Sequence, residues 1–255
     1  MLLAIDAGNT TLGIGVFRAR ELAAAFRIAT LRERTADEYG ILLSNLLAAR
    51  GIEGREVQAA AVSCVVPPLA PRLEEALRTY FRVEPLFVEP GIRTGIAVVA
   101  ENPQEVGADR IVNAVAAHAR CRSAAVVVDF GTATTFDAIS AQAEYLGGAI
   151  APGIEIGAEA LFLRAARLPR VEIRRPPRVI GRNTVHSMQA GLVYGYVGLV
   201  RWIVARMKEE LGGEARVLAT GGYLELLLEE LSGCIDEAVP HLTLEGLRLV
   251  HERNR

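Results

Sequence analysis

Two short segments each place an aspartate at the end of an apolar run and follow it with glycine and threonine. They read "LLAIDAGNTTLGIGVF" and "AVVVDFGTATTFDAI", so that Asp6 corresponds to Asp129 and Gly8 to Gly131. A glycine lets the backbone turn tightly and approach a ligand closely. Successive N–H groups beside threonine hydroxyls form a concave donor surface for phosphate oxygens, and a carboxylate can hold Mg²⁺ directly or through water. The simpler interpretation is that each aspartate only caps its own turn.

A third segment, "ENPQEVGADRIVNAVAAHARC", joins a carboxylate to a guanidinium at the start of an apolar helix. Asn102 is the expected cap of the helix entry, and Asp109 lies at the start of the apolar helix, where the helix dipole favours an ionised carboxylate by about 0.3–1 kcal/mol. Asp109 is thus expected to be a weak but charged base, which suffices if phosphoryl transfer is loose and positioning dominates. Arg110 offers a planar fork for a carboxylate or phosphate. By spacing alone, a helix cap with a surface ion pair is the simpler interpretation.

A fourth segment, "ATGGYLELL", places Gly221 and Gly222 between a strand and a helix. Two glycines permit close approach of the backbone to a nucleotide base or sugar. A plain strand-to-helix turn fits the pattern equally well.

Composition excludes several classes of protein. The net charge of −2, from 28 basic and 30 acidic residues, argues against a protein built to bind nucleic acid. Lys208 is the sole lysine, so neither a Walker A loop nor the strand lysine of protein kinases is present. If the protein binds phosphate, it must therefore use backbone amides, arginine and metal.

Cellular location is also limited by the sequence. Met1 leads at once into a strand, so no signal peptide is expected, and the longest uncharged apolar run, Ala190–Val200, is too short to span a bilayer. The three cysteines and four histidines are scattered, without the spacing of a zinc site. We expect a cytoplasmic protein that contacts neither membrane nor nucleic acid.

Strands alternate with helices along the chain, which indicates an α/β protein. The repeated aspartate phrase indicates a duplicated domain, with lobes over residues 1–121 and 122–255, each directing one loop into a cleft between them. Coincidence between two similar hairpins is the alternative. The expected strands include 2–6, 12–18 and 22–28, and the expected helices are 35–50 (with Thr35 as cap), 71–81, 154–166 and 185–211.

Together, "DAGNTTLGIG", "ENPQEVGADRIVNAVAA", "VDFGTATTFD", "GGAIAPG" and "ATGG" resemble the type III pantothenate kinase family over nearly the whole chain. The resemblance implies an acetate-and-sugar-kinase/Hsp70/actin-like fold of two ribonuclease-H-like lobes. It also implies a homodimer that uses ATP, Mg²⁺ and a monovalent cation, K⁺ or NH₄⁺, to phosphorylate pantothenate in the first step of coenzyme A synthesis.

The resemblance also assigns residues to roles. Asp109 is the implied proton acceptor, Asp129 the monovalent-cation ligand and Asp6 the carboxylate for ATP-bound Mg²⁺. The nucleotide contacts are Asp6, Ala7, Gly8, Asn9, Thr10, Thr11, Leu12, Gly13 and Thr132, and the substrate contacts are Gly107, Ala108, Asp109, Arg110 and Thr184. Thr184 could equally cap the long helix that follows it. Ala100 stands where many members have a tyrosine that helps to cover the substrate.

Two other functions fit the same residues. One is a catalytically silent nucleotide-binding regulator, which the joint presence of Asp6, Asp109 and Asp129 disfavours. The other is a kinase for a different small molecule, or a polyphosphate phosphohydrolase, on the same fold.

Overall fold

A computed structural model describes all 255 residues, which divide into two compact units. Unit 1 comprises Met1–Ala97, Glu101–Ala116 and Leu242–Arg255, and unit 2 comprises Val98–Ala100 and Ala117–His241. Helix α7 (Leu242–Arg253) thus belongs to unit 1, although the predicted boundary at residue 121 placed it in the second lobe. The reason is packing, because α7 contacts strands β1, β2 and β4 of unit 1.

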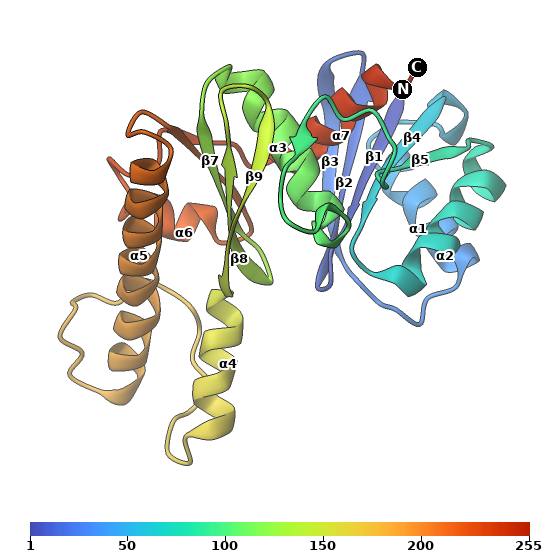
Figure 1. Cartoon of the computed structure of the whole chain (residues 1–255). Helices are drawn as coiled ribbons and strands as arrows, with labels where there is room; N and C mark the ends of the chain where they lie inside the picture. Colours follow the sequence, from blue (N-terminus) through green and yellow to red (C-terminus); the bar gives the residue numbers. More distant parts are fainter. The chain divides into compact units, whose positions relative to one another are not determined.

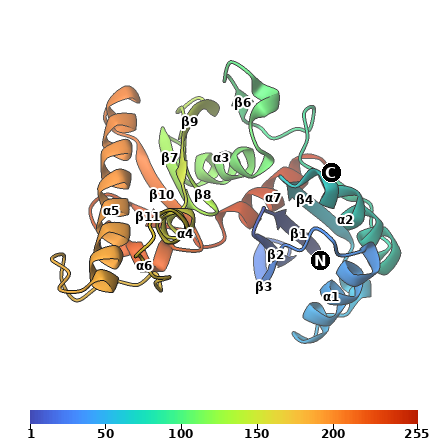
Figure 2. The ribbon, with the colours of Figure 1, turned by 90° about the horizontal axis from the view of Figure 1, so that it is seen from below.

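The unit 1 sheet has the strand order β3-β2-β1-β4-β5 (Figures 1 and 2). Its strands are β1 (Leu2–Ala7), β2 (Thr11–Arg18), β3 (Glu21–Ala29), β4 (Ala59–Cys64) and β5 (Pro85–Phe87). The first three are antiparallel, whereas β1, β4 and β5 run parallel. The central strand β1 reads as a continuous apolar run because both of its faces are covered.

One face of this sheet packs on α1 (Ala36–Ala48) and α2 (Ala70–Ala76), which continues as a π-helical turn over Leu77–Phe81. Helix α1 begins as predicted: the Thr35 hydroxyl accepts from the Glu38 N–H, and the Glu38 carboxylate accepts from the Thr35 N–H. This capping box satisfies N–H groups that a helix start leaves without an intrahelical partner.

Helix α7 also contacts the first part of α3 (Ala108–Cys121), whose residues up to Ala116 belong to unit 1. A Cβ at Gly246 would lie 2.0 Å from the Val112 carbonyl oxygen, so the two helices can approach this closely only with glycine at 246. On the sheet, a Leu244 methyl group would lie 3.0 Å from a Cβ at Gly15. Two glycines thus allow the C-terminal helix to fit.

The unit 2 sheet repeats the unit 1 order and adds an edge strand, giving β11-β10-β7-β8-β9-β6. Its strands are β7 (Ala125–Phe130), β8 (Ala133–Ile139), β9 (Glu144–Pro152), β10 (Arg216–Gly221), β11 (Glu237–Ala238) and β6 (Ala97–Val98). In both sheets an antiparallel three-strand meander is followed by two parallel strands on the other side of the first strand. This shared topology supports the predicted duplication.

The helices of unit 2 are α4 (Ile154–Arg164), α5 (Thr184–Glu210) and α6 (Leu224–Leu228). The apolar core lies between the sheet and helices α5 and α6, and includes Val126, Val128 and Val193. By length and composition α5 could cross a membrane, but half of its most apolar window is buried in the protein, as in the core helix of a globular domain.

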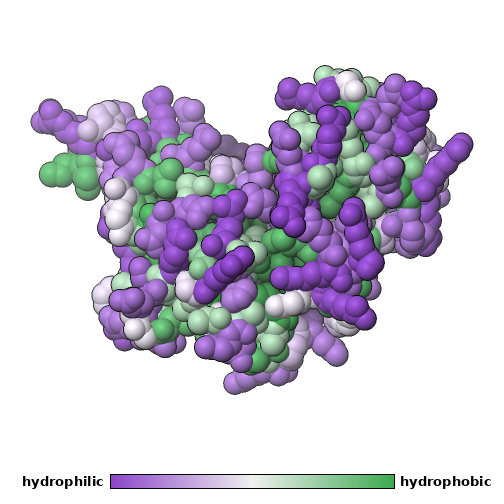
Figure 3. All heavy atoms as spheres, turned by 90° about the horizontal axis from the view of Figure 1, so that it is seen from above, coloured by the Kyte–Doolittle hydropathy of each residue, from purple (hydrophilic) through white to green (hydrophobic).

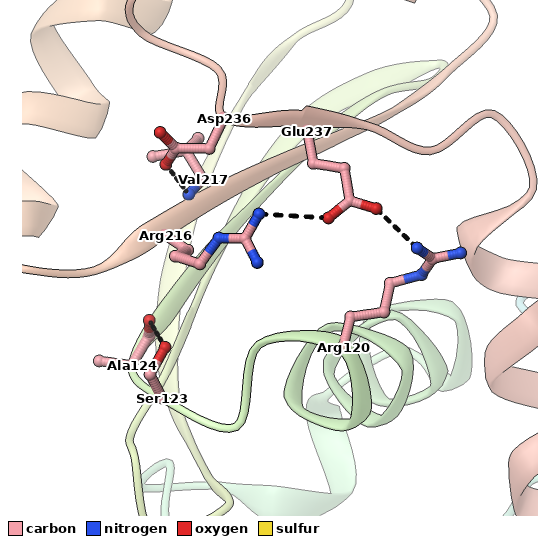
Figure 4. A network of polar contacts seen from close by, with 7 residues as sticks. All are labelled: Arg120, Ser123, Ala124, Arg216, Val217, Asp236 and Glu237. Atoms are coloured by element: carbon pink, nitrogen blue, oxygen red, sulfur yellow. Dashed lines mark hydrogen bonds and ion pairs between the residues drawn. The ribbon is translucent and has the colours of Figure 1, made fainter.

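An ion-pair network ties the edge strand β11 to its neighbours in unit 2 (Figure 4). The Glu237 carboxylate contacts Arg120 at 2.6 Å and Arg216 at 3.4 Å, and the Asp236 carboxylate accepts from the Val217 N–H at 2.7 Å. Because the charged side chains are partly exposed, each pair stabilises the fold by about 1 kcal/mol or less.

Candidate active site

The Asp6 loop joins β1 to β2 in unit 1. Asp6 is half-buried, and it pairs with Gly13 in β2 and with Ser63 in β4. The turn closes through the Gly8 N–H, which donates to the Thr11 carbonyl at 3.0 Å. A Cβ at position 8 would lie 3.1 Å from that oxygen, so glycine relieves a close approach in the turn.

Exposure divides the predicted nucleotide-binding residues of this loop into two groups. Asn9, Thr10 and Thr11 are exposed at the tip, where backbone and side chains can meet a ligand. Ala7 and Leu12 are fully buried in the core of unit 1, so only their backbone atoms are available for binding.

The segment that carries Asp109 meets the same strand edge. The helix α3 begins at Ala108, and a Cβ at Gly107 would lie 2.5 Å from the Asp109 carboxylate and 3.6 Å from a Val65 methyl group. The Val65 N–H in turn donates to the Ala7 carbonyl at 3.1 Å. The start of α3 therefore lies at the carboxyl ends of β1 and β4, in the same unit as the Asp6 loop.

The predicted start of this helix was wrong. Asn102 precedes a short 3-10 turn, Pro103–Glu105, and its side chain makes no capping hydrogen bond. Proline at 103 suits a first turn of either helix type, and the sequence alone did not separate the two.

The protonation of Asp109 also differs from the expectation. Burial raises the pKa of the Asp109 carboxyl, and it outweighs both the Arg110 N–H, which donates to the carboxylate at 2.8 Å, and the Arg110 guanidinium charge. Asp109 is thus a stronger base than an exposed aspartate, rather than a carboxylate kept ionised by its helix.

The second aspartate loop lies in unit 2, at the end of β7. Asp129 pairs with Thr135 in β8 and Thr220 in β10. Gly221 has a φ of +102°, and a Cβ there would lie 2.6 Å from the Asp129 carboxylate and 2.5 Å from the Phe130 nitrogen. Only glycine meets both demands, so the first glycine of "ATGG" supports the Asp129 loop.

The other side of this loop is held by Gly153, just before α4. The Gly153 N–H donates to the Thr132 carbonyl at 3.1 Å, and a Cβ at 153 would lie 2.1 Å from that oxygen. Thr132 itself is exposed. Gly153 was not among the predicted site residues, although it ends the segment "GGAIAPG" that follows a strand.

A hydrogen bond between Glu155 in α4 and Tyr223, which directly follows "ATGG", links these two segments of unit 2. The Tyr223 hydroxyl donates to the Glu155 carboxylate, and burial together with this bond raises the pKa of Tyr223. Both residues line a surface groove of about 350 Å³ in unit 2, with Phe162 and Arg170 further along it.

Thr184 begins α5 but does not cap it. The cap is Asn183, whose side-chain oxygen accepts from the His186 N–H at 2.8 Å. Thr184 is exposed, so its hydroxyl is accessible to a ligand.

No cluster of three or more His, Cys, Asp and Glu side chains could hold a metal ion on its own. Mg²⁺ commonly binds through one or two carboxylates together with substrate phosphates, and Asp6 fits that role. Near it, burial and the Asp6 charge raise the pKa of the Cys64 thiol, so Cys64 stays protonated and is a poor metal ligand.

Comparison with known proteins decides the family. The family model for type III pantothenate kinase matches residues 2–206. This chain belongs to the type III pantothenate kinase family. Type III pantothenate kinases from Myxococcus xanthus and Moorella thermoacetica are 58% and 54% identical to it, with the whole of this chain and 99% and 100% of those proteins covered. Membership makes the chain a kinase, as the residues indicated.

Solved structures agree on the fold. A Baf family transcriptional activator from Campylobacter jejuni has a TM-score of 0.58 at 20% identity, covering 99% of this chain and 98% of that one. A ROK hexokinase from Thermus thermophilus has a TM-score of 0.54 at 15% identity, covering 98% and 97%. At these identities the likeness shows the fold alone, and it confirms the predicted actin-like α/β class for this member of the type III pantothenate kinase family.

Proposed function

We propose that this chain transfers the γ-phosphoryl group of ATP to the primary hydroxyl of pantothenate, giving 4′-phosphopantothenate in the first step of coenzyme A biosynthesis. The observation that carries the proposal is the half-buried carboxylate of Asp109 at the strand edge of the Asp6 loop, in a chain of this family. The edge formed by the carboxyl ends of strands is the usual ligand-binding edge of α/β sheets.

In this mechanism Asp109 orients the pantothenate hydroxyl and accepts its proton. Burial raises the pKa of its carboxyl, which makes Asp109 a stronger base than an exposed aspartate. Arg110 binds the carboxylate of pantothenate or a phosphate oxygen, and the backbone of Gly107 and Ala108 borders the substrate. In a loose transition state most of the rate gain comes from this positioning.

Each aspartate loop is proposed to have a role of its own in nucleotide binding. The amides of the Asp6 loop would bind phosphate oxygens, and Asp6 would hold the Mg²⁺ that the nucleotide carries. The Thr132 hydroxyl is a further proposed nucleotide contact. The Mg²⁺ ion would neutralise charge on the transferring phosphoryl group. Asp129 is the proposed ligand of the monovalent cation, K⁺ or NH₄⁺. The groove beside Tyr223 is proposed to receive the base or sugar.

We propose a homodimer that forms through unit 2 in the cytoplasm. Large apolar side chains are exposed mainly there, including Ile150 at 65%, Trp202 at 69% and Ile180 at 83%. In Figure 3 hydrophobic residues lie among hydrophilic ones on the face that is seen. Such exposure is typical of surfaces that associate. In the dimer, Thr184 is proposed to contact substrate.

A coupled assay of ADP release, with and without pantothenate, tests the reaction, and mass spectrometry identifies the product. We expect ADP release only with pantothenate, and stimulation by K⁺ or NH₄⁺ over Na⁺. Intact ATP binding without pantothenate-dependent release would instead favour a silent regulator. Release with another alcohol in a substrate screen would favour a different small-molecule kinase. Light scattering tests the dimer.

A further inference from the structure

The segment that follows β3 holds the Asp6 loop from one side. The Thr30 hydroxyl donates to the Gly8 carbonyl at 2.7 Å, and the Thr30 N–H donates to the Thr10 carbonyl at 2.9 Å. The second bond continues the β2–β3 ladder beyond its last pair, Thr11 with Ala29. The first bond is additional, since it depends on the threonine side chain.

These two bonds fix the directions of two N–H groups in the loop. The chain has no cis peptide bond, and in a planar trans peptide the C=O and N–H groups point in opposite directions. The Gly8 carbonyl shares its peptide with the Asn9 N–H, and the Thr10 carbonyl shares its peptide with the Thr11 N–H. Because both carbonyls point toward Thr30, both N–H groups point to the opposite side of the loop.

The segment around Thr30 is itself braced. The Arg72 guanidinium on α2 donates to the carbonyls of Arg32 and Arg34, the latter at 3.0 Å. The Arg32 guanidinium donates to the Asn9 side-chain oxygen at 2.9 Å. Thr30 therefore acts from a segment tied both to a helix of unit 1 and to the loop tip.

The Gly8–Asn9 peptide has particular need of such a restraint. Glycine has access to most backbone conformations, so this peptide can rotate more readily than its neighbours. A rotation would replace the Asn9 N–H by the Gly8 carbonyl oxygen on the ligand side, and that oxygen would repel a phosphate. The Thr30 hydroxyl opposes the rotation by holding the Gly8 carbonyl.

We propose that Thr30 is a positioning residue for phosphate binding, which keeps the Asn9 and Thr11 N–H groups directed at the nucleotide. The inference rests on the proposed function for its ligand, ATP. Thr30 acts through the loop and does not touch the substrate.

The test compares Thr30→Val, which keeps the branched shape but removes the hydroxyl, with Thr30→Ser, which keeps the hydroxyl. Loss of one hydrogen bond that orients a charged contact is expected to weaken binding of Mg²⁺ with the ATP analogue AMP-PNP by about 10-fold in Thr30→Val. Thr30→Ser should stay within about twofold of the wild type. Calorimetric titration without pantothenate measures both, and thermal unfolding checks the fold.

A matched control is Ser44→Ala, which also removes a hydroxyl bonded to a backbone carbonyl, that of Gly40 at 2.8 Å within α1 of the same unit. It should leave nucleotide affinity unchanged. In steady-state assays, Thr30→Val should raise KM for ATP and leave KM for pantothenate within about twofold, whereas a general loss of folding would lower the active fraction without this split.

Wild-type affinity in Thr30→Val, or an equal loss in Thr30→Ser and Ser44→Ala, would overturn the inference. If Thr30→Val does not fold, Thr30→Ala, which removes the hydroxyl without adding a methyl group, decides by the same affinity criterion. Absence of pantothenate-dependent ADP release in the wild type would refute the proposed reaction instead. The affinity comparison would still decide the role of Thr30, because it uses no pantothenate.

Discussion

The two aspartate loops occupy the same place in two sheets of the same strand order, yet they are held by different means. In unit 1 the last pair of the hairpin, Ala7 with Leu12, leaves residues 8–11 in the turn. In unit 2 the last pair, Phe130 with Thr134, leaves residues 131–133, so the second turn is shorter. A duplicated hairpin has thus kept its aspartate while its turn has changed length.

The means of support differ as well. Thr30 holds the longer turn through its side-chain hydroxyl and its backbone N–H, from the segment that follows β3. The shorter turn is enclosed by the backbone at Gly153 and Gly221, where any Cβ would collide with it. Equivalent loops therefore need not be sensitive to equivalent substitutions: one depends on a hydroxyl, the other on the absence of side chains.

The largest effect, a loss of kcat/KM, is expected at Asp109, the proposed base, which belongs to unit 1 and has no assigned counterpart in unit 2. Asp109→Asn removes the proton acceptor but keeps the shape, and it should lower kcat/KM by about 10²–10⁴-fold, the usual contribution of a general base. Initial rates of ADP release measure this. Glu105→Gln, an exposed carboxylate in the preceding 3-10 turn, is the control and should stay near wild type. A near-normal kcat in Asp109→Asn would remove the base assignment.

The second-largest effect is a difference between the two loops in how much stability a glycine-to-alanine substitution removes. Gly153→Ala would place a methyl group 2.1 Å from the Thr132 carbonyl, and we expect a loss of about 3 kcal/mol in the free energy of unfolding. Gly8→Ala meets an oxygen at 3.1 Å, which a small shift accommodates, so its loss should be about 1 kcal/mol or less. Urea unfolding measures both. Equal losses would show that the two turns are equally tolerant.

A smaller effect is expected at Gly221. Gly221→Ala should lower the free energy of unfolding by about 2–3 kcal/mol, because a positive φ adds strain to the collision with Asp129 and Phe130. Its control is Gly212→Ala, which has a φ of +87° but no neighbour within 4 Å and should lose about 1 kcal/mol through strain alone. If Gly221→Ala and Gly212→Ala lost the same free energy of unfolding, the collision with the Asp129 loop would add nothing to the strain of a positive φ.

The smallest effect concerns pH and Asp109. Because burial raises the pKa of this carboxyl in the folded state, its favourable contribution is complete at low pH and is lost as pH rises through the folded pKa. Asp109→Asn should therefore unfold at the same or a slightly higher temperature than wild type at pH 7–8, with the difference narrowing toward about pH 4. A variant markedly less stable at pH 8 would contradict the burial of a charge at this position.

Much of the fold could be predicted where the signal is local. The Thr35–Glu38 capping box set the start of α1, and the repeated aspartate phrase predicted a duplicated domain, which the strand order shared by the two sheets supports. Helix starts were harder, because several neighbouring residues could cap. Asn183 caps α5 where Thr184 was the candidate, and α3 begins at Ala108 where Asn102 was expected.

Features of the site that depend on distant contacts could not be predicted. The segment of Thr30 carries no recognisable motif, and its role follows from bonds to a loop made by residues 8 and 10. The raised pKa of Asp109 follows from burial, which the first turn of a helix does not reveal. Gly153 directly follows β9 and Gly221 ends β10, and both carry a signal in principle, since glycines at strand ends often mark close approach of backbones.

Unit 1 is not continuous along the chain, and this bears on its synthesis. Residues 242–255 carry the helix that packs on the sheet begun by residues 2–7, and every residue of unit 2 is translated between these two segments. Unit 2 can thus assemble on the ribosome while the first sheet still lacks the helix that covers one of its faces. The N-terminal strands of this kinase are synthesised first but are covered by α7 only when the chain is complete. A chaperone that shields exposed apolar surface would therefore act on these strands rather than on the sheet of unit 2.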